Sequence, residues 1–200
     1  MKRLDFYALQ EILAQVRRVV PNAIIGGGAV RDIFLGAAPK DIDCFIQVDL
    51  ADLEDRVNAV AYQLKGQVTP GPASYGDIPS YDIVLPGIAQ PLNLVHRDVS
   101  PLMDVGDYDF GLNQAAVDGY VIVTTAAFKK DIADNTVTYM HADKIKPDWH
   151  RKSSANRLLR ITVKHPSFAA KNHEILRPWI AEAMREDIRE VLAIKAGDLL

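Results

Sequence analysis

Apolar residues recur at three- and four-residue steps from Leu4 to Val20 and stop at Pro21-Asn22. This spacing predicts an amphipathic opening helix. A short apolar run over 23–25 then enters the glycines at 26–28, and a second helical pattern over 29–35 ends at Gly36. The order of these signals predicts a strand, a glycine turn and a helix.

Strand signals alternate with turn signals through the middle of the chain. The β-branched and aromatic content of 41–48 predicts a strand, and 49–64 reads as a helix that Gly66 ends. Proline and glycine make 69–79 a loop. Strands are expected at 81–85 and 92–96, on either side of the turn Pro86-Gly87.

The pair Asp118-Gly119 predicts a two-residue hairpin turn between strands at 114–117 and 120–124. One more strand is expected at 136–140 after a short helix, and helices are expected at 153–165 and 178–194. The pattern therefore predicts an α/β fold in which a small mixed sheet is flanked by helices. We expect a head domain over 1–150 and a helical C-terminal segment over 151–200.

Composition places the chain among folded globular proteins. It has 200 residues, of which 48% are hydrophobic and 24% are charged. No apolar run approaches the ~18 residues that span a bilayer, and the N-terminus does not resemble a signal peptide. Cys44 is the single cysteine, which excludes an internal disulfide or a zinc site of paired cysteines. We expect a cytoplasmic protein with no membrane partner.

Charge is distributed unevenly along the sequence. Residues 1–140 carry 11 basic and 18 acidic side chains, whereas residues 141–200 carry 12 basic and 8 acidic ones. The acidic part suits a metal site and the basic part suits phosphate groups. An ordinary solvated pair of helices has a similar basic excess, so charge alone identifies no nucleic-acid partner.

Asp41 and Asp43 open a predicted strand, where alternate side chains share a face. Their carboxylates should lie side by side, with Ile42 and Cys44 turned into the core. Paired hard oxygen ligands on a rigid element can hold divalent metal, which activates an attacking hydroxyl and neutralises a leaving pyrophosphate. The alternative is a solvated or strand-capping pair, because Asp-x-Asp is common by chance.

The glycine turn lies just upstream of these aspartates. Backbone N–H groups at such a turn can cradle phosphate. Arg31 stands where a dinucleotide-binding fingerprint has its third glycine, and no Gly-Lys-Ser/Thr follows. Those observations exclude the dinucleotide and P-loop interpretations and leave a plain strand-to-helix turn as the alternative.

The segments 26–32, 35–36 and 39–43 together resemble a known family. They are similar to the head domain of class II tRNA CCA-adding enzymes and bacterial poly(A) polymerases, in the polymerase-β-like nucleotidyltransferase superfamily. Two later stretches resemble family segments in the same order, namely 109–115 (DFGLNQA) and 157–160 (RLLR). The resemblance spans about residues 20–168.

This resemblance implies Mg²⁺-dependent transfer of a nucleoside monophosphate from an NTP to an acceptor hydroxyl, with release of pyrophosphate. RNA or a tRNA 3′ end is the favoured acceptor. Asp41 and Asp43 would hold a two-metal Mg²⁺ site. The residues implied to bind the nucleotide are Gly26, Gly27, Gly28, Arg31, Asp32, Asp109, Asn113, Arg157 and Arg160.

The spacing of Arg157, Arg160 and Lys164 supports one of these assignments independently. At i, i+3 and i+7 they share one helix face, as expected of a cationic stripe that faces phosphates. A solvated helix face is the alternative.

Several residues depart from the family pattern. The family's third carboxylate falls on Asn93, which we assign to the catalytic site although an amide cannot accept a proton. Asp82 and Asp98 are both candidates to replace it. The arginines that usually precede Asp-Phe are Asp107 and Tyr108, and the usual Asp-Pro before RLLR is Ser154-Ala155.

Other functions stay open at this stage. The chain is short for the family's RNA-gripping domains, so a transferase that modifies a protein or small-molecule hydroxyl is one alternative. A degenerate head that binds nucleotide without turnover is another. Trp149 and Trp179 are expected in the core, and Cys44 should be a buried, inert thiol. The five histidines show no metal spacing.

Overall fold

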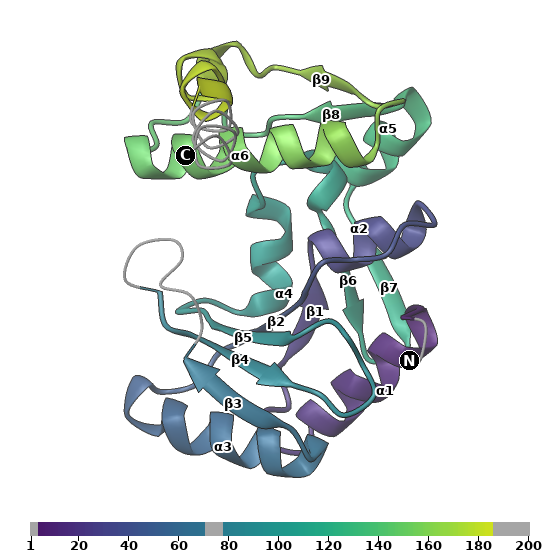
Figure 1. Ribbon diagram of the computed structural model, residues 1–200, viewed down its shortest axis with the longest axis vertical. Helices are drawn as coiled ribbons and strands as arrows, with labels where there is room; N and C mark the ends of the chain where they lie inside the picture. The colour runs from purple at the N-terminus through teal and green to yellow at the C-terminus, as the bar shows by residue number, and fades with distance from the viewer. Residues whose placement is uncertain (1–3, 71–77, 186–200) are drawn as a thin grey trace, which may run out of the picture.

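The computed structural model describes residues 4–70 and 78–185 (Figure 1). Its main feature is a mixed seven-stranded sheet with the order β3-β4-β5-β2-β1-β6-β7. The pair β2–β5 is parallel and the other pairs of this sheet are antiparallel. The predicted α/β fold with a mixed sheet is therefore confirmed.

The strands of this sheet are short. In spatial order they are β3 (Gln67–Pro70), β4 (Ser80–Val84), β5 (Leu92–His96), β2 (Ile42–Ile46), β1 (Ile24–Gly26), β6 (Ala115–Asp118) and β7 (Val121–Thr124). A second sheet pairs β8 (Thr136–Thr138) with β9 (Ala169–Lys171) in parallel.

Helices α1 (Phe6–Val16) and α3 (Leu53–Leu64) cover one face of the seven-stranded sheet. Asp5 caps α1, since its side chain accepts a 2.8 Å hydrogen bond from the Ala8 N–H. The core on this face joins the inner residues of both helices to alternate strand residues, among them Leu9, Leu13, Val57, Val60, Ile42, Cys44, Ile83, Leu92 and Leu94. The opposite face of the central strands carries a smaller apolar cluster of Ile24, Val105 and Ala116, beside positions that are open to polar side chains.

A second core lies in the upper part of Figure 1, under α6 (Asp148–Lys164). Phe110, Leu112 and Tyr139 pack there against Leu158 and Ile161 of this helix. This core contains residues from both sides of position 150. The predicted domain boundary at position 150 therefore stays a prediction.

The remaining elements connect these layers. They are the helices α2 (Gly28–Phe34), α4 (Pro101–Asp104) and α5 (Ala126–Asp134), and the 3₁₀ turns η1 (Leu50–Asp52), η2 (Val105–Asp107), η3 (Gly111–Asn113) and η4 (Glu174–Leu176). No helix in the described part of the chain is long and apolar enough to cross a membrane.

The sequence missed β3, α4 and β9, whose short segments carry no clear periodicity. The hairpin is confirmed but its turn is shifted by one residue, because Asp118 pairs with Val121 and leaves Gly119-Tyr120 as the turn. Helix α6 begins at Asp148, ahead of the expected start at 153. The last predicted helix is present over 177–185, and its remainder lies outside the described residues, as does most of the predicted 69–79 loop.

Candidate active site

Asp41 and Asp43 lie at the beginning of β2, on the face of the sheet away from α1 and α3. Ile42 and Cys44, which alternate with them, are fully buried in the core. The predicted inward and outward placement of these four residues is thus confirmed. Burial raises the pKa of the Cys44 thiol to about 12, so this cysteine is an inert core residue as expected.

The charge on Asp43 is poorly compensated. Burial and then the neighbouring Asp41 raise the pKa of Asp43 to about 6, although Arg157 and a hydrogen bond from Asn93 act in the opposite direction. Within the described residues Asp41 forms no ion pair or hydrogen bond. A divalent cation between these carboxylates would relieve their repulsion.

Asn93 stands beside Asp43 in the parallel pair β2–β5. Its Nδ2 donates a 3.2 Å hydrogen bond to Oδ1 of Asp43, while its own Oδ1 is buried with no partner among the described residues. The reverse amide orientation would set its oxygen against the carboxylate. Asn93 therefore orients Asp43 by hydrogen bonding through its nitrogen, and not through its oxygen.

The register separates the two candidates for the missing carboxylate. Asp82 is directly opposite Asn93 across β4–β5 and so shares the face of Asp43. Partial burial and then Asp41 raise the pKa of Asp82, with Lys40 opposing. Asp98 follows the far end of β5, and its side chain is 93% exposed beside His96. The structure thus favours Asp82 over Asp98.

The acidic side chains do not form a complete metal site by themselves. No group of three or more histidine, cysteine or carboxylate side chains that could hold a metal occurs among the described residues. Mg²⁺ is usually held by one or two carboxylates together with substrate phosphates and water. Two adjacent, uncompensated carboxylates fit that pattern, with the remaining ligands supplied by a nucleotide.

The glycine turn connects β1 to α2 next to these aspartates. Gly27 has φ +69°, which strains any residue with a side chain. A Cβ at Gly26 would lie 2.8 Å from the hydroxyl of Tyr108, so this position has no room for one. Gly28 has ordinary space around it, its nearest neighbour being Arg31 at 3.5 Å.

Tyr108 occupies the place where the family has an arginine. Its ring packs on Phe45 with centroids 5.5 Å apart, and its buried hydroxyl has no partner among the described residues. Burial raises the pKa of this phenol well above its usual value. An uncharged ring at the glycine turn means that phosphate contacts available to an arginine are missing there.

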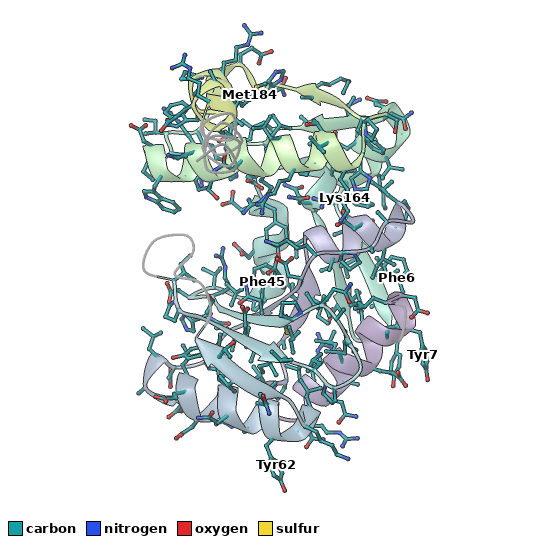
Figure 2. All side chains as sticks on the ribbon, in the orientation of Figure 1. Phe6, Tyr7, Phe45, Tyr62, Lys164 and Met184 are labelled. Carbon is teal, nitrogen blue, oxygen red and sulfur yellow. The ribbon has the colours of Figure 1, made fainter. Side chains whose placement is uncertain are left out.

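Arg31 and Asp32 belong to an internal ion network. Asp32 is 3% exposed and accepts hydrogen bonds from Arg31 Nε at 2.8 Å, from His165 Nε2 at 3.0 Å and from Lys164. Arg31 also donates to Oδ1 of Asn113 at 2.6 Å. Figure 2 shows Lys164 between α6 and α2. This buried network joins α2 to the C-terminal end of α6. It therefore fixes the position of α2, which follows the glycine turn.

The predicted cationic stripe on α6 is largely paired with carboxylates. Arg157 donates to Asp109, which is 4% exposed and also accepts a 3.0 Å hydrogen bond from Ser154. Lys164 is bound to Asp32 as described above. Arg160 is exposed and has no ion pair within the described residues. Arg157 still acts electrostatically on Asp43 and opposes the rise in the pKa of that carboxyl.

The two tryptophans have different environments. Trp179 packs against the second core, with the guanidinium of Arg151 5.6 Å from its ring centroid, as a core residue should. Trp149 is 51% exposed, so the expectation that it is buried is wrong. It lies in the first turn of α6, beyond the reach of the second core.

An open cavity of about 820 Å³ lies at the other end of β2 and β5. It is lined by residues that follow these strands, including Gln47, Val48 and Arg97. Because Asp41 and Asp43 are at the beginning of β2, this cavity is remote from the acidic site.

No known family model and no curated protein matches the sequence. Solved structures do match. The CCA-adding enzyme of Thermotoga maritima, in complex with tRNA, superposes with a TM-score of 0.60 at 16% identity, over 91% of this chain and 47% of that one. The chain has the fold of the CCA-adding enzymes.

Two further structures agree. A CCA-adding enzyme with CTP gives a TM-score of 0.59 at 17% identity, over 95% of this chain and 48% of that one. A tRNA nucleotidyltransferase with a primer tRNA and an ATP analogue gives 0.57 at 20% identity, over 81% and 47%. The predicted resemblance to CCA-adding enzymes is confirmed at the level of fold, and the chain spans about half their length.

Proposed function

We propose that this protein is a Mg²⁺-dependent nucleotidyltransferase that moves a nucleoside monophosphate from an NTP to an acceptor hydroxyl. The observation that carries the proposal is the pair Asp41 and Asp43 beside the glycine turn, where burial and then the charge of Asp41 raise the pKa of Asp43 although Arg157 opposes the rise. In a fold shared with CCA-adding enzymes, such a pair suits metal-assisted phosphoryl chemistry.

Asp41 and Asp43 would hold the metal. Mg²⁺ bound there would neutralise the triphosphate and lower the pKa of the attacking hydroxyl. Asn93 keeps Asp43 in place through its 3.2 Å hydrogen bond. The Arg31–Asp32 network fixes α2, and with it the glycine turn, against α6.

The chemical step is an in-line displacement. The acceptor oxygen forms a bond to the α-phosphorus, the bond from that phosphorus to the bridging oxygen breaks, and pyrophosphate leaves. The hydroxyl proton needs an acceptor, and we assign it to Asp82, the carboxylate across β5 from Asp43. We expect Arg157 and Arg160 of α6 to meet the charge of the phosphates, Arg157 beside its ion pair with Asp109.

RNA, with a tRNA 3′ end as the favoured case, is the acceptor that we propose. The support is that two of the similar enzymes were solved with tRNA, and that residues 141–200 are basic. Nothing in the structure favours a protein or small-molecule acceptor.

Label transfer tests the proposal. Each α-labelled NTP is offered with Mg²⁺, total RNA and cell extract to the wild type, to Asp41→Asn/Asp43→Asn and to the matched surface control Asp134→Asn. We expect labelled RNA with the wild type and the control and none with the double variant. Label on protein would overturn the proposed acceptor. NTP binding without any transfer would support the degenerate nucleotide-binding alternative instead.

A further inference from the structure

Trp149 exposes a large apolar ring at the N-terminal end of α6. It is 51% exposed, and its indole contacts the ring of His150 with centroids 5.6 Å apart. An exposed indole forgoes roughly 2 kcal/mol of the stabilisation that burial would give. Its place in a helical turn limits the conformations of the ring, which suits it to receive a flat ligand.

The helix phase relates this ring to the site. At about 100° per residue, Trp149, Arg160 and Arg157 fall within roughly 80° of one another around α6. Along the axis, Trp149 lies about 12 Å from Arg157 and about 17 Å from Arg160. Arg157 acts on Asp43 across the space between α6 and the sheet. One side of α6 thus carries an aromatic ring and two arginines, of which Arg157 acts on Asp43.

Arg160 gives α6 a positive charge that is complementary to a polyanion, whereas Lys152, Arg157 and Lys164 are paired with carboxylates. The helix carries five basic residues and one acidic residue in its sequence DWHRKSSANRLLRITVK. Arg160 has no ion pair within the described residues. A ring for a base and a cation for a phosphate on one surface are what single-stranded nucleic acid requires.

We infer that Trp149 is a stacking platform for an unpaired base of the acceptor RNA, close to the 3′ end that Asp41 and Asp43 serve. The inference rests on the proposed function for the identity of the acceptor. The strand would run along α6 from Trp149 towards Arg157, with its backbone near Arg160. Every base has a flat face, so this contact holds RNA without reading its sequence.

Binding can be measured without turnover. A fluorescein-labelled, unstructured oligoribonucleotide is titrated, with no NTP present, against wild type, Trp149→Phe and Trp149→Ala. We expect Trp149→Ala to weaken Kd about 5- to 150-fold, the range for one lost base stack, and Trp149→Phe to weaken it less. The matched control is Tyr62→Ala on α3, an 86% exposed aromatic at the far end of the molecule (Figure 2) that should leave Kd unchanged.

Two readouts identify stacking itself. The chain has two tryptophans, so Trp179→Phe leaves Trp149 as its sole indole, and its emission should be quenched as RNA binds. An RNA whose 3′-terminal nucleotides lack bases should bind the wild type more weakly than the intact RNA does. Trp149→Ala should bind the two RNAs equally well. Unchanged Kd in Trp149→Ala together with unchanged emission would overturn the inference.

A different occupant would also be visible. If Trp149 packs against a second copy of the chain, sedimentation will show a dimer that Trp149→Ala converts to monomer, with RNA affinity unchanged, and the inference fails. If the wild type transfers no label to RNA but RNA still quenches the emission of Trp149, the proposed activity is overturned and the stacking surface stays supported.

Discussion

Asn93 donates its amide hydrogen to Asp43 across the parallel strands β5 and β2, at 3.2 Å. The family pattern that the sequence resembles has a carboxylate at this position, so this chain exchanges a negative charge for a hydrogen-bond donor relative to that pattern. The exchange reduces repulsion around Asp43 and lowers the charge available to a metal. It leaves Asp82, one strand further along the sheet, as the nearest further carboxylate on this face.

Restoring the carboxylate with Asn93→Asp should strengthen metal binding. An added charged ligand beside Asp43 should tighten Mg²⁺ binding about tenfold. The same variant should unfold more easily without metal, by about 1 kcal/mol, because like charges then oppose each other across strands. Thermal unfolding over a Mg²⁺ titration measures both effects. Asn93→Ala is the control, and a Mg²⁺ response no greater than that of the wild type would contradict the expectation.

Asp82→Asn should slow label transfer about 100-fold, since general-base groups contribute on that scale. Its KM for NTP should change little, because the proposed role is to accept the proton of the acceptor. Asp98→Asn, on the other candidate carboxylate, should leave kcat unchanged. Partial recovery of kcat in Asn93→Asp/Asp82→Asn would show that the two positions serve one function. Equal effects of Asp82→Asn and Asp98→Asn would refute the assignment.

The raised pKa of Asp43 makes stability depend on pH. Its pKa rises from 3.8 to about 6 on folding, so the folded state binds more protons between these values and stability falls as the pH rises through them. In chelator at about pH 8, Asp43→Asn should therefore be more stable than the wild type by about 3 kcal/mol. The difference should vanish below about pH 3, where Asp43 is protonated in both states. Urea unfolding at several pH values tests this, and a gain that persists in acid would contradict it.

The buried network around Asp32 should matter for stability. Asp32→Asn leaves Arg31 and Lys164 facing a neutral group inside the protein, which should lower the free energy of unfolding by about 3 kcal/mol. Asp134→Asn, which breaks an exposed ion pair with Lys130, should barely change it. Urea unfolding compares the two variants. A small effect of Asp32→Asn, combined with a large rise in KM for NTP, would instead mean that this carboxylate serves the nucleotide directly.

Gly26 and Tyr108 should be energetically coupled. The methyl group in Gly26→Ala meets the Tyr108 hydroxyl, so the variant should lose about 2 kcal/mol of stability. Gly26→Ala/Tyr108→Phe should recover about 1 kcal/mol, because the colliding oxygen is gone. Gly106→Ala is the matched control, since nothing lies within 4 Å of its Cβ. An additive double-mutant cycle would show that the backbone, and not the hydroxyl, limits position 26.

Local sequence signals predicted most of the elements around the site. The alternation at 41–44 determined which side chains face outward, since successive residues of a strand point to opposite faces. The glycines at 26–28 and the Asp118-Gly119 pair marked turns, because glycine adopts the positive φ that Gly27 and Gly119 have here. These features depend only on residues that are neighbours in the chain, so they can be predicted from the sequence.

Pairing between distant strands was decided only by the fold. No local sequence signal predicts that residue 82 lies opposite residue 93, or that residue 93 lies beside residue 43. The choice between Asp82 and Asp98 depended on that register. The burial of Asp32 and the exposure of Trp149 likewise follow from how α6 packs against the rest of the chain. The sequence by itself determined the acidic pair, the glycine turn and the fold class, because short-range geometry and composition dictate them. Tertiary structure decided which charges meet and which ring stays exposed, because those contacts join residues far apart in the chain.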